Sequence, residues 1–235
     1  VRRMLKRLEA IRKATQDPEP AVRQAAVRSL SAVEEAMDIE RLTRLARNGK
    51  KQARLRALYA LRDCGSPTAL DALGALVRES DDPDARSAAA SCLGQRGAEA
   101  APHLRDALDD PERSVAEEAM RALVHVGAEG AAEWITDAAR RRQPLEDAAI
   151  EALGALGDDR AADFLTEFIR NGSADQQYAA AQALARLGPE VAEDTLIATA
   201  EADDANLRRA AVEALGELRP PRLEAAAHAG SSAGA

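Results

Sequence analysis

The feature that most constrains the fold is a repeat of about 31 residues that recurs from one end of the chain to the other. Its best-preserved copies read DPEPAVRQAAVRSL at 17–30, DDPDARSAAASCL at 81–93 and DDANLRRAAVEAL at 203–215. The leucine that closes each copy recurs every 30 to 32 residues, at Leu30, Leu61, Leu93, Leu123, Leu153, Leu184 and Leu215. A second apolar residue precedes each of these anchor leucines by 19 or 20 positions. Seven copies predict a repeat protein in which each repeat packs against its neighbours.

Each repeat has the pattern of a helix, a short turn and a second helix. A glycine follows the anchor leucine by four residues in most copies, where a left-handed cap ends a helix: Gly65, Gly97, Gly127, Gly157 and Gly188. Polar residues suited to starting the second helix stand in the opposite turn: Asp17, Asn48, Asp81, Asp110, Asn171 and Asp203. Strand-forming residues do not alternate anywhere, so no sheet is expected.

These patterns predict an all-α solenoid of about seven helical hairpins in a single domain spanning residues 1–219. The expected repeats are 1–34, 35–65, 66–97, 98–127, 128–157, 158–188 and 189–219. Pro220 and Pro221 stop the last helix, and the Ala/Gly/Ser-rich segment after them is too poor in apolar side chains to fold. We expect residues 220–235 to be a disordered tail or linker.

The net charge of −8 is distributed unevenly. Residues 1–62 carry 16 Lys and Arg against 7 Asp and Glu, whereas residues 63–235 carry 16 against 33. This asymmetry favours an acidic partner for the N-terminal end or head-to-tail association between molecules, and a merely uneven solvated surface is the alternative. We expect a monomer or a weakly head-to-tail associated protein.

No apolar run approaches the 18 residues of a membrane helix, and no signal peptide is recognisable. We therefore expect a cytoplasmic protein without a membrane segment, unless a targeting segment lies outside this chain. Cys64 and Cys92 occupy small apolar positions of neighbouring repeats. Buried free thiols are favoured there over a disulfide.

The pattern Asp-x-x-x-x-Val-Arg, followed by Ala-Ala-x-x-Ala-Leu and a glycine, resembles the HEAT repeat over residues 1–218. More narrowly, it resembles the short bacterial HEAT-like repeats named after the phycobilisome lyases. The resemblance implies a right-handed solenoid in which a turn aspartate pairs with an arginine of the second helix, as Asp17 with Arg23 and, less regularly, Asp203 with Arg208. Proteins of this family include scaffolds, bilin lyases, chaperone-like factors, iron-dependent hydroxylases and DNA-repair glycosylases.

The residues needed for catalysis are missing from this pattern. The hydroxylases resembled here bind iron through His-Glu pairs, but His103, His125 and His228 are not followed by glutamate. There is no phosphate-binding glycine loop, nucleophile elbow or Cys-x-x-Cys motif. No cofactor and no metal are therefore expected. The acidic array repels a phosphate backbone and lacks an aromatic series for base stacking, which argues against a nucleic-acid partner.

The surface with the best case for recognition is the concave side, which the resemblance assigns to the second helices. Positions six and two before each anchor leucine share one helix face outside the apolar stripe, and both tyrosines of the chain fall there. Tyrosine and arginine are enriched at binding hot spots. The candidate partner-binding residues are Arg28, Leu55, Tyr59, Glu117, Arg121, His125, Asp147, Tyr178, Gln182 and Arg186. Ordinary solvated positions are the alternative interpretation.

A second candidate is the run Arg140, Arg141 and Arg142 in a turn within one repeat. Three adjacent arginines can bind a carboxylate or phosphate, or they can neutralise acidic turns nearby, such as that at Asp109 and Asp110. The sequence as a whole predicts a non-catalytic scaffold or adaptor that binds a protein or peptide along the concave face. The alternative is a bilin-lyase-like or chaperone-like helper that holds a chromophore or client chain, for which Tyr59, Tyr178 and Asp147 would line the pocket.

Overall fold

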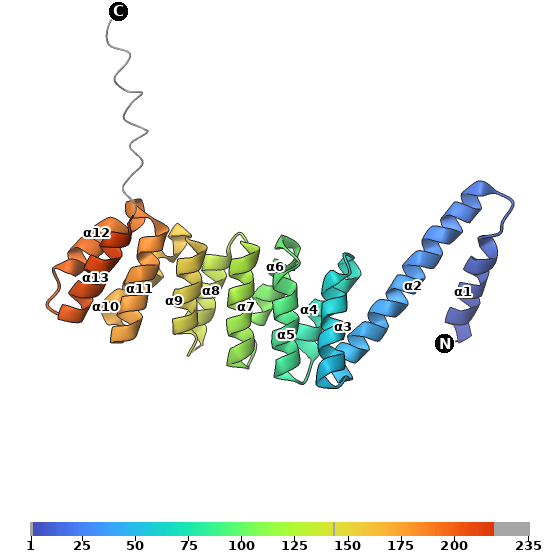
Figure 1. Cartoon of the computed structure of the whole chain (residues 1–235), viewed down its shortest axis with the longest axis horizontal. Coiled ribbons are helices and arrows are strands. Elements are labelled where there is room, and N and C mark those ends of the chain that lie inside the picture. Colours follow the sequence, from blue (N-terminus) through green and yellow to red (C-terminus); the bar gives the residue numbers. More distant parts are fainter. Residues whose placement is uncertain (1, 143, 219–235) are drawn as a thin grey trace, which may run out of the picture. The chain divides into compact units, whose positions relative to one another are not determined.

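The computed structural model describes residues 2–142 and 144–218, and the described chain is built from helices and turns alone (Figure 1). It contains thirteen α-helices and two short 3-10 helices in these ranges, with no strand. Consecutive helices pack as antiparallel hairpins, and each hairpin packs on the next within its unit. The predicted all-α solenoid of helical hairpins is confirmed. The predicted tail at 220–235 lies outside the described residues.

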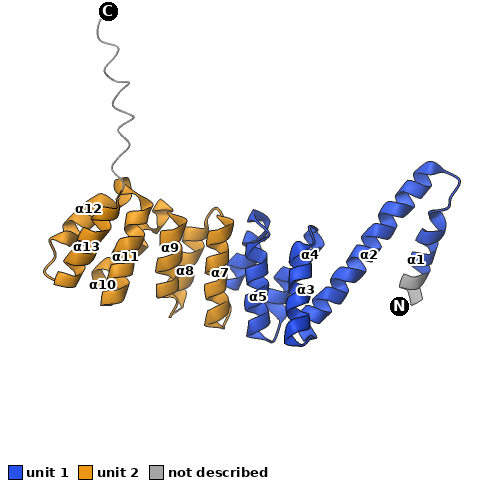
Figure 2. Cartoon of the chain, viewed as in Figure 1, with its two compact units in different colours: residues 1–107 blue, residues 108–235 orange. Residues whose placement is uncertain are grey.

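The chain divides into two compact units, residues 1–107 and residues 108–235 (Figure 2). We call them the N-terminal and the C-terminal unit. The helices of the N-terminal unit are α1 (Arg2–Ala14), α2 (Pro20–Asn48), α3 (Lys51–Asp63), α4 (Pro67–Glu79), α5 (Pro83–Gly94), the 3-10 helix η1 (Ala98–Ala100) and α6 (Ala101–Ala107). Those of the C-terminal unit are α7 (Arg113–Val126), α8 (Ala131–Arg141), α9 (Glu146–Leu156), the 3-10 helix η2 (Asp159–Ala161), α10 (Ala162–Asn171), α11 (Ala174–Leu187), α12 (Pro189–Ala200) and α13 (Ala205–Glu217).

The anchor leucines form the core of each unit. Five of them are fully buried, namely Leu61, Leu93, Leu123, Leu153 and Leu184, whereas Leu30 and Leu215 at the two ends of the array are only half-buried. Alanines fill the space between neighbouring second helices. One such close approach is between α9 and α11, where a Cβ built on Gly154 would lie 2.6 Å from the Cβ of Ala183. Small residues at this register let the helix backbones come together.

The N-terminal region differs from the repeat pattern in one respect. The pattern expects a turn near residue 34, between the first two repeats, but α2 continues through it as one helix of 29 residues. The physical reason is visible in the sequence. Where five other repeats have glycine, four residues after the anchor leucine, the first repeat has Glu34 within the strongly helix-forming stretch Ala-Val-Glu-Glu-Ala-Met.

The predicted residues that end and begin the helices are confirmed in part. Gly127 and Gly157 adopt the left-handed conformation that ends α7 and α9, as predicted. Gly97 and Gly188 have positive φ but a different ψ, and Gly65 has no positive φ because α3 ends in extended backbone at Cys64. At the helix starts, the observed N-cap residues fall one or two positions after the predicted ones, for example at Asp82 and Asp204.

Arginine side chains stabilise the turns, mostly by hydrogen bonds to main-chain carbonyl oxygens. Arg23 donates to the carbonyl oxygens of Asp17 and Pro18, both at 2.8 Å, rather than to the Asp17 carboxylate. Arg208 likewise donates to the carbonyl oxygens of Ala202 and Asp203, both at 2.7 Å. At these two turns, arginine–carbonyl contacts therefore replace the expected aspartate–arginine pairs, whereas Arg54 pairs with the carboxylate of Asp82 in the next repeat.

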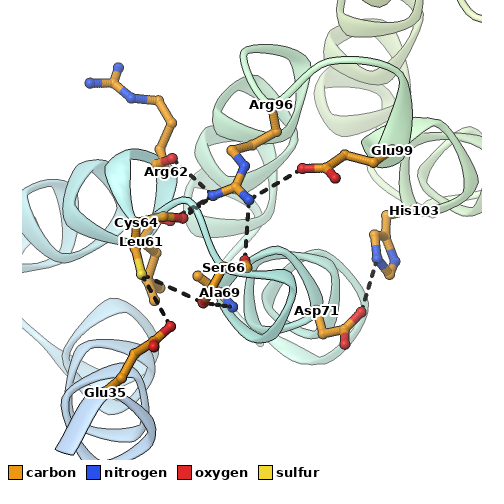
Figure 3. A network of polar contacts seen from close by, with 10 residues as sticks. All are labelled: Glu35, Leu61, Arg62, Cys64, Ser66, Ala69, Asp71, Arg96, Glu99 and His103. Atoms are coloured by element: carbon orange, nitrogen blue, oxygen red, sulfur yellow. Dashed lines mark hydrogen bonds and ion pairs between the residues drawn. The ribbon is translucent and has the colours of Figure 1, made fainter. Parts of the chain in front are cut away.

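Arg96 forms the densest network of this kind (Figure 3). Its guanidinium donates to the carbonyl oxygens of Arg62 at 3.1 Å, Ser66 at 3.2 Å and Cys64, and its side chain is only 7% exposed. Glu99 supplies the counter-charge at 3.3 Å. Arg96 thereby fixes the turn between α3 and α4. Cys64, beside this network, is half-buried, Cys92 is buried, and the two cysteines are not joined by a disulfide.

Candidate functional site

The second helices of the C-terminal unit form a continuous row, because α7 packs on α9, α9 on α11 and α11 on α13. Seven of the ten predicted partner-binding residues lie on this row. Glu117, Arg121 and His125 come from α7, Asp147 from α9, and Tyr178, Gln182 and Arg186 from α11. We call the surface that α7, α9, α11 and α13 form the second-helix face.

A hollow of about 210 Å³ lies between α7 and α9 on this face. Glu117, Arg121 and Val124 line it from α7, while Glu151 and three alanines, Ala148, Ala152 and Ala155, line it from α9. Two of these residues belong to the predicted binding set. The alanines give the hollow an apolar wall, and the carboxylates give it a negative rim.

The charges around the hollow are already organised within α7. Arg113 pairs with Glu117, and this carboxylate raises the pKa of the Arg113 guanidinium. Arg121 donates to Glu118 through two nitrogens, at 2.8 and 3.1 Å. Glu151, on the opposite wall, makes no ion pair with any described residue. The hollow therefore presents one carboxylate whose charge is not balanced locally.

Farther along the face, α11 is tied to α13. The Tyr178 hydroxyl donates to the Glu213 carboxylate, which raises the pKa of Tyr178. The Gln182 amide, oriented so that its nitrogen faces Glu217, donates to that carboxylate at 2.6 Å. Tyr178 is 42% exposed, but Gln182 is only 8% exposed. Gln182 can therefore position a neighbour more readily than it can contact a partner, and its predicted binding role stays a prediction.

The remaining residues of this set on the C-terminal unit are exposed. Asp147 accepts a hydrogen bond at 2.8 Å from Gln176 of α11. His125 and Arg186 lie at the ends of α7 and α11. In the described part of the chain, no three His, Cys, Asp or Glu side chains gather as they would around a metal ion. His228 lies outside the described residues.

Three predicted residues belong to the N-terminal unit. Arg28 on α2 is exposed, Leu55 on α3 is half-buried, and Tyr59 on α3 is 48% exposed. The Arg62 guanidinium carbon lies 5.0 Å from the centre of the Tyr59 ring, a cation–π distance. The predicted stripe thus falls on both units, and the hollow lies in the C-terminal part of it.

The three adjacent arginines point to separate partners. Arg140 approaches Glu167 at 3.5 Å, Arg141 pairs with Asp109 at 2.9 Å, and Arg142 donates to the carbonyl oxygens of Asp110 and Pro111. Their guanidiniums do not converge on one point, which favours neutralisation of the acidic turn over a shared anion site.

Comparison with known proteins gives a family and several structural likenesses. A family model described as HEAT repeats matches residues 4–62, 39–124, 101–185 and 168–229. A search of curated proteins finds no significant match. One similar solved structure is the complex of CpcE and CpcF of phycocyanin lyase from Nostoc sp. PCC7120, with 26% identity, 76% of each chain covered and a TM-score of 0.51.

Two further structures are alike at lower scores. Human deoxyhypusine hydroxylase is 24% identical over 82% of this chain and 89% of that chain, with a TM-score of 0.41. A designed armadillo repeat protein is 15% identical over 77% of this chain and 100% of that chain, with a TM-score of 0.45. Among the described helices, none combines the length and the apolar composition needed to cross a bilayer.

Proposed function

Because the chain belongs to the HEAT-repeat family, we propose that it is a non-catalytic scaffold that binds a protein or peptide segment across its second-helix face. The observation that carries the proposal is the hollow between α7 and α9, which two of the predicted binding residues line. Concave or grooved surfaces of stacked helices are the usual recognition sites of repeat proteins.

The hollow also indicates the chemistry of the bound segment. Its volume of about 210 Å³ is below the roughly 300–1,000 Å³ of small-molecule pockets and suits one or two side chains. Glu151 has no local counter-charge, and the alanines beside it offer an apolar wall. We expect a lysine or arginine whose aliphatic stem packs on the alanines while its charged head reaches Glu151.

The test is a comparison of three forms of the full chain in affinity capture from the source lysate, quantified by mass spectrometry. Glu151→Lys with Ala155→Arg, both at exposed positions that line the hollow, fills it and reverses its charge. Asp137→Lys makes a similar charge change on the exposed side of α8 and serves as the matched control. We expect a partner captured by the wild type and by the control but lost from the double variant. Equal capture by all three forms would contradict the assignment to the hollow.

The likeness to the phycocyanin lyase complex favours a second candidate, a bilin-lyase-like or chaperone-like helper. The size of the hollow weighs against it, because an open-chain tetrapyrrole needs a larger pocket, and neither tyrosine lines this one. Incubation with a bilin followed by visible absorption spectroscopy separates the two. A stable shift of the bilin band that co-elutes with the protein would favour the helper, and an unchanged spectrum would favour the scaffold.

A further inference from the structure

The first repeat exposes a surface that the inner repeats bury. Val27 on α2, three residues before its anchor leucine, is 54% exposed. The equivalent residues of the next five repeats are at most 1% exposed: Leu58, Ala90, Met120, Ile150 and Ala181. In the last repeat, Val212 is 58% exposed, as expected for a hairpin that no described hairpin follows. The first repeat does have a following repeat, so the exposure of Val27 needs another explanation.

The second repeat also exposes the residue that would pack against the first repeat. Ala60 on α3, one residue before its anchor leucine, is exposed. The equivalent residues of the later repeats are at most 5% exposed: Cys92, Ala122, Ala152, Ala183 and Ala214. On α11 the residue at this position is Ala183, and it contacts Gly154 of α9. Gly154 is the residue directly after the anchor leucine of its own repeat. The residue that corresponds to Gly154 in the first repeat is Ser31, which is also exposed. We call the surface of Val27 and Ser31 on α2 together with Ala60 on α3 the open seam.

The cause of the open seam is the continuous helix α2. A helix of 29 residues is about 43 Å long, roughly twice the length of α11. Its N-terminal half, with α1 packed beside it, leads away from α3 (Figure 1). The two walls of the seam lie on one chain, but a straight α2 prevents them from meeting within that chain.

The length of the junction does not require this arrangement. Leu30 and Leu42 are 12 residues apart, as are Leu184 and Leu196, where Gly188 and Pro189 separate α11 from α12. The junction is therefore long enough for a turn, and only its residue types, with Glu34 in the glycine position, favour the continuous helix.

We propose that the open seam is closed by a second copy of this chain, through reciprocal exchange of residues 2–34. In such a dimer, α1 and the N-terminal half of α2 from each copy pack on α3 of the other copy. Each exchange repeats the contact that Gly154 and Ala183 make between inner repeats, so no new type of interface is required. Conversion of a turn into a continuous helix is a low-cost route to such dimers, because the same contacts form between chains instead of within one.

The choice of a second copy over a different protein follows from the seam itself. Both walls carry the small and apolar residues of the repeat at the register that fits them together. A foreign helix would have to reproduce that register on both sides. An exchange between two copies also closes on itself, whereas head-to-tail association through the charged ends of the array would add further copies as the concentration rises.

Disulfide trapping in the full chain tests the exchange. Ser31→Cys and Ala60→Cys are introduced together after the native thiols are removed by Cys64→Ser and Cys92→Ala. We expect oxidation to give a covalent dimer on non-reducing gels. Two differently tagged single variants, one Ser31→Cys and the other Ala60→Cys, should form a mixed disulfide with each other after unfolding and joint refolding. Ser29→Cys in place of Ser31→Cys, on the opposite side of α2, is the matched control for random collision.

A second variant tests the cause. Glu34→Gly with Glu35→Pro copies the Gly188–Pro189 junction into α2, and we expect it to convert the dimer into a monomer with an intrachain disulfide in the same cysteine pair. Light scattering after size exclusion should give twice the chain mass for the parent and once for this variant. Four results would overturn the proposal: a monomeric parent, an intrachain disulfide in the parent, cross-linking no greater than in the Ser29→Cys control, or a size that grows beyond two chains.

Discussion

Arg96 shows how one residue can hold a turn between repeats. It occupies the third position after its anchor leucine, where the other repeats have apolar or thiol side chains: Val33, Cys64, Val126, Leu156, Leu187 and Leu218. A charged residue in that register was a visible sign of a special role, but the sequence could not show that its partners are main-chain carbonyls. Carbonyl oxygens carry no residue signature, because every residue has one.

We predict that Arg96→Met destabilises the fold by about 1.5–3 kcal/mol, the usual range for hydrogen bonds to a charged group. The loss leaves the carbonyls at the end of α3 and in the turn after it without their donor, in part-buried surroundings. Urea unfolding followed by circular dichroism measures the effect. Arg41→Met, which removes an ion pair whose arginine side chain is 70% exposed, is the control and should cost under about 0.5 kcal/mol. Equal losses in the two variants would show that the carbonyl network contributes nothing special.

Asp158 gives a residue-scale dependence on pH. Its carboxylate accepts from Arg160 at 2.6 and 2.9 Å, and this hydrogen bonding lowers the pKa of Asp158. Because the folded pKa lies below the unfolded value of about 3.9, the stabilisation is present above that pH and is lost as the pH falls through the folded pKa. Asp158→Asn should therefore cost under about 1 kcal/mol at pH 7.

The same variant should begin to lose its disadvantage below about pH 4, where the unfolded wild type takes up a proton at Asp158, and should lose it fully only below the folded pKa of Asp158. Urea midpoints at pH 7, 5 and 3 measure the difference, with Asp137→Asn on the exposed side of α8 as the control. A gap between wild type and Asp158→Asn that persists unchanged at pH 3 would contradict the assignment of this carboxylate.

At the scale of helices, the sequence predicts that second helices pack closely, but it does not show which of them do. The sequence shows that alanines and glycines recur on the second helices, which indicates a close approach. Glycine follows the anchor leucine at Gly94, Gly154 and Gly216, yet only the structure distinguishes the last two. A Cβ on Gly154 would meet Ala183, whereas a Cβ on Gly216 would meet nothing within 4 Å.

We therefore predict opposite effects for the same substitution at equivalent positions. Gly154→Ala should destabilise by about 1–3 kcal/mol, because its Cβ would lie 2.8 Å from the Cα of Ala183 and force α9 and α11 apart. Gly216→Ala should be neutral or stabilise by up to about 1 kcal/mol, because alanine restricts the unfolded chain and favours helix. Thermal unfolding of both variants beside the wild type is sufficient. Similar shifts of the midpoint in the two variants would contradict the packing described for α9 and α11.

The element that the repeat pattern does not anticipate is α2. Seven anchor leucines at one spacing predict seven equal hairpins, and therefore a turn between the first two. The residues at 31–37 favour a helix instead, but the repeat spacing alone takes no account of them. Helix propensity was nevertheless readable there, because Glu34 stands where glycine stands in five other repeats.

At the candidate site, the sequence predicts the positions of single residues but not the shape of the surface. The positions of Glu117 and Arg121 on one helix face follow from spacing alone, but the hollow between α7 and α9 depends on side-chain volumes across two repeats.

At the scale of the whole molecule, a solenoid is stabilised by contacts between neighbouring repeats, so local stability follows how well each repeat is covered. The middle repeats have fully buried anchor leucines. The first repeat has a half-buried Leu30 and an exposed Val27, and the seam toward α3 is open. The chain should therefore open from its N-terminal end before its middle.

Hydrogen exchange with mass spectrometry can test this gradient. At the lowest workable concentration, amides of α1 and residues 20–34 should exchange faster than those of α9, because their helices open without disturbing another repeat. As the concentration rises and a second copy covers the seam, protection of residues 20–34 and of the amides around Ala60 should increase together, while α9 should not change. Joint protection of two segments that do not meet within one chain is specific to exchange between copies. Protection of residues 20–34 equal to that of α9 at the lowest concentration would mean that the first repeat is already covered within its own chain, and the gradient would then be wrong.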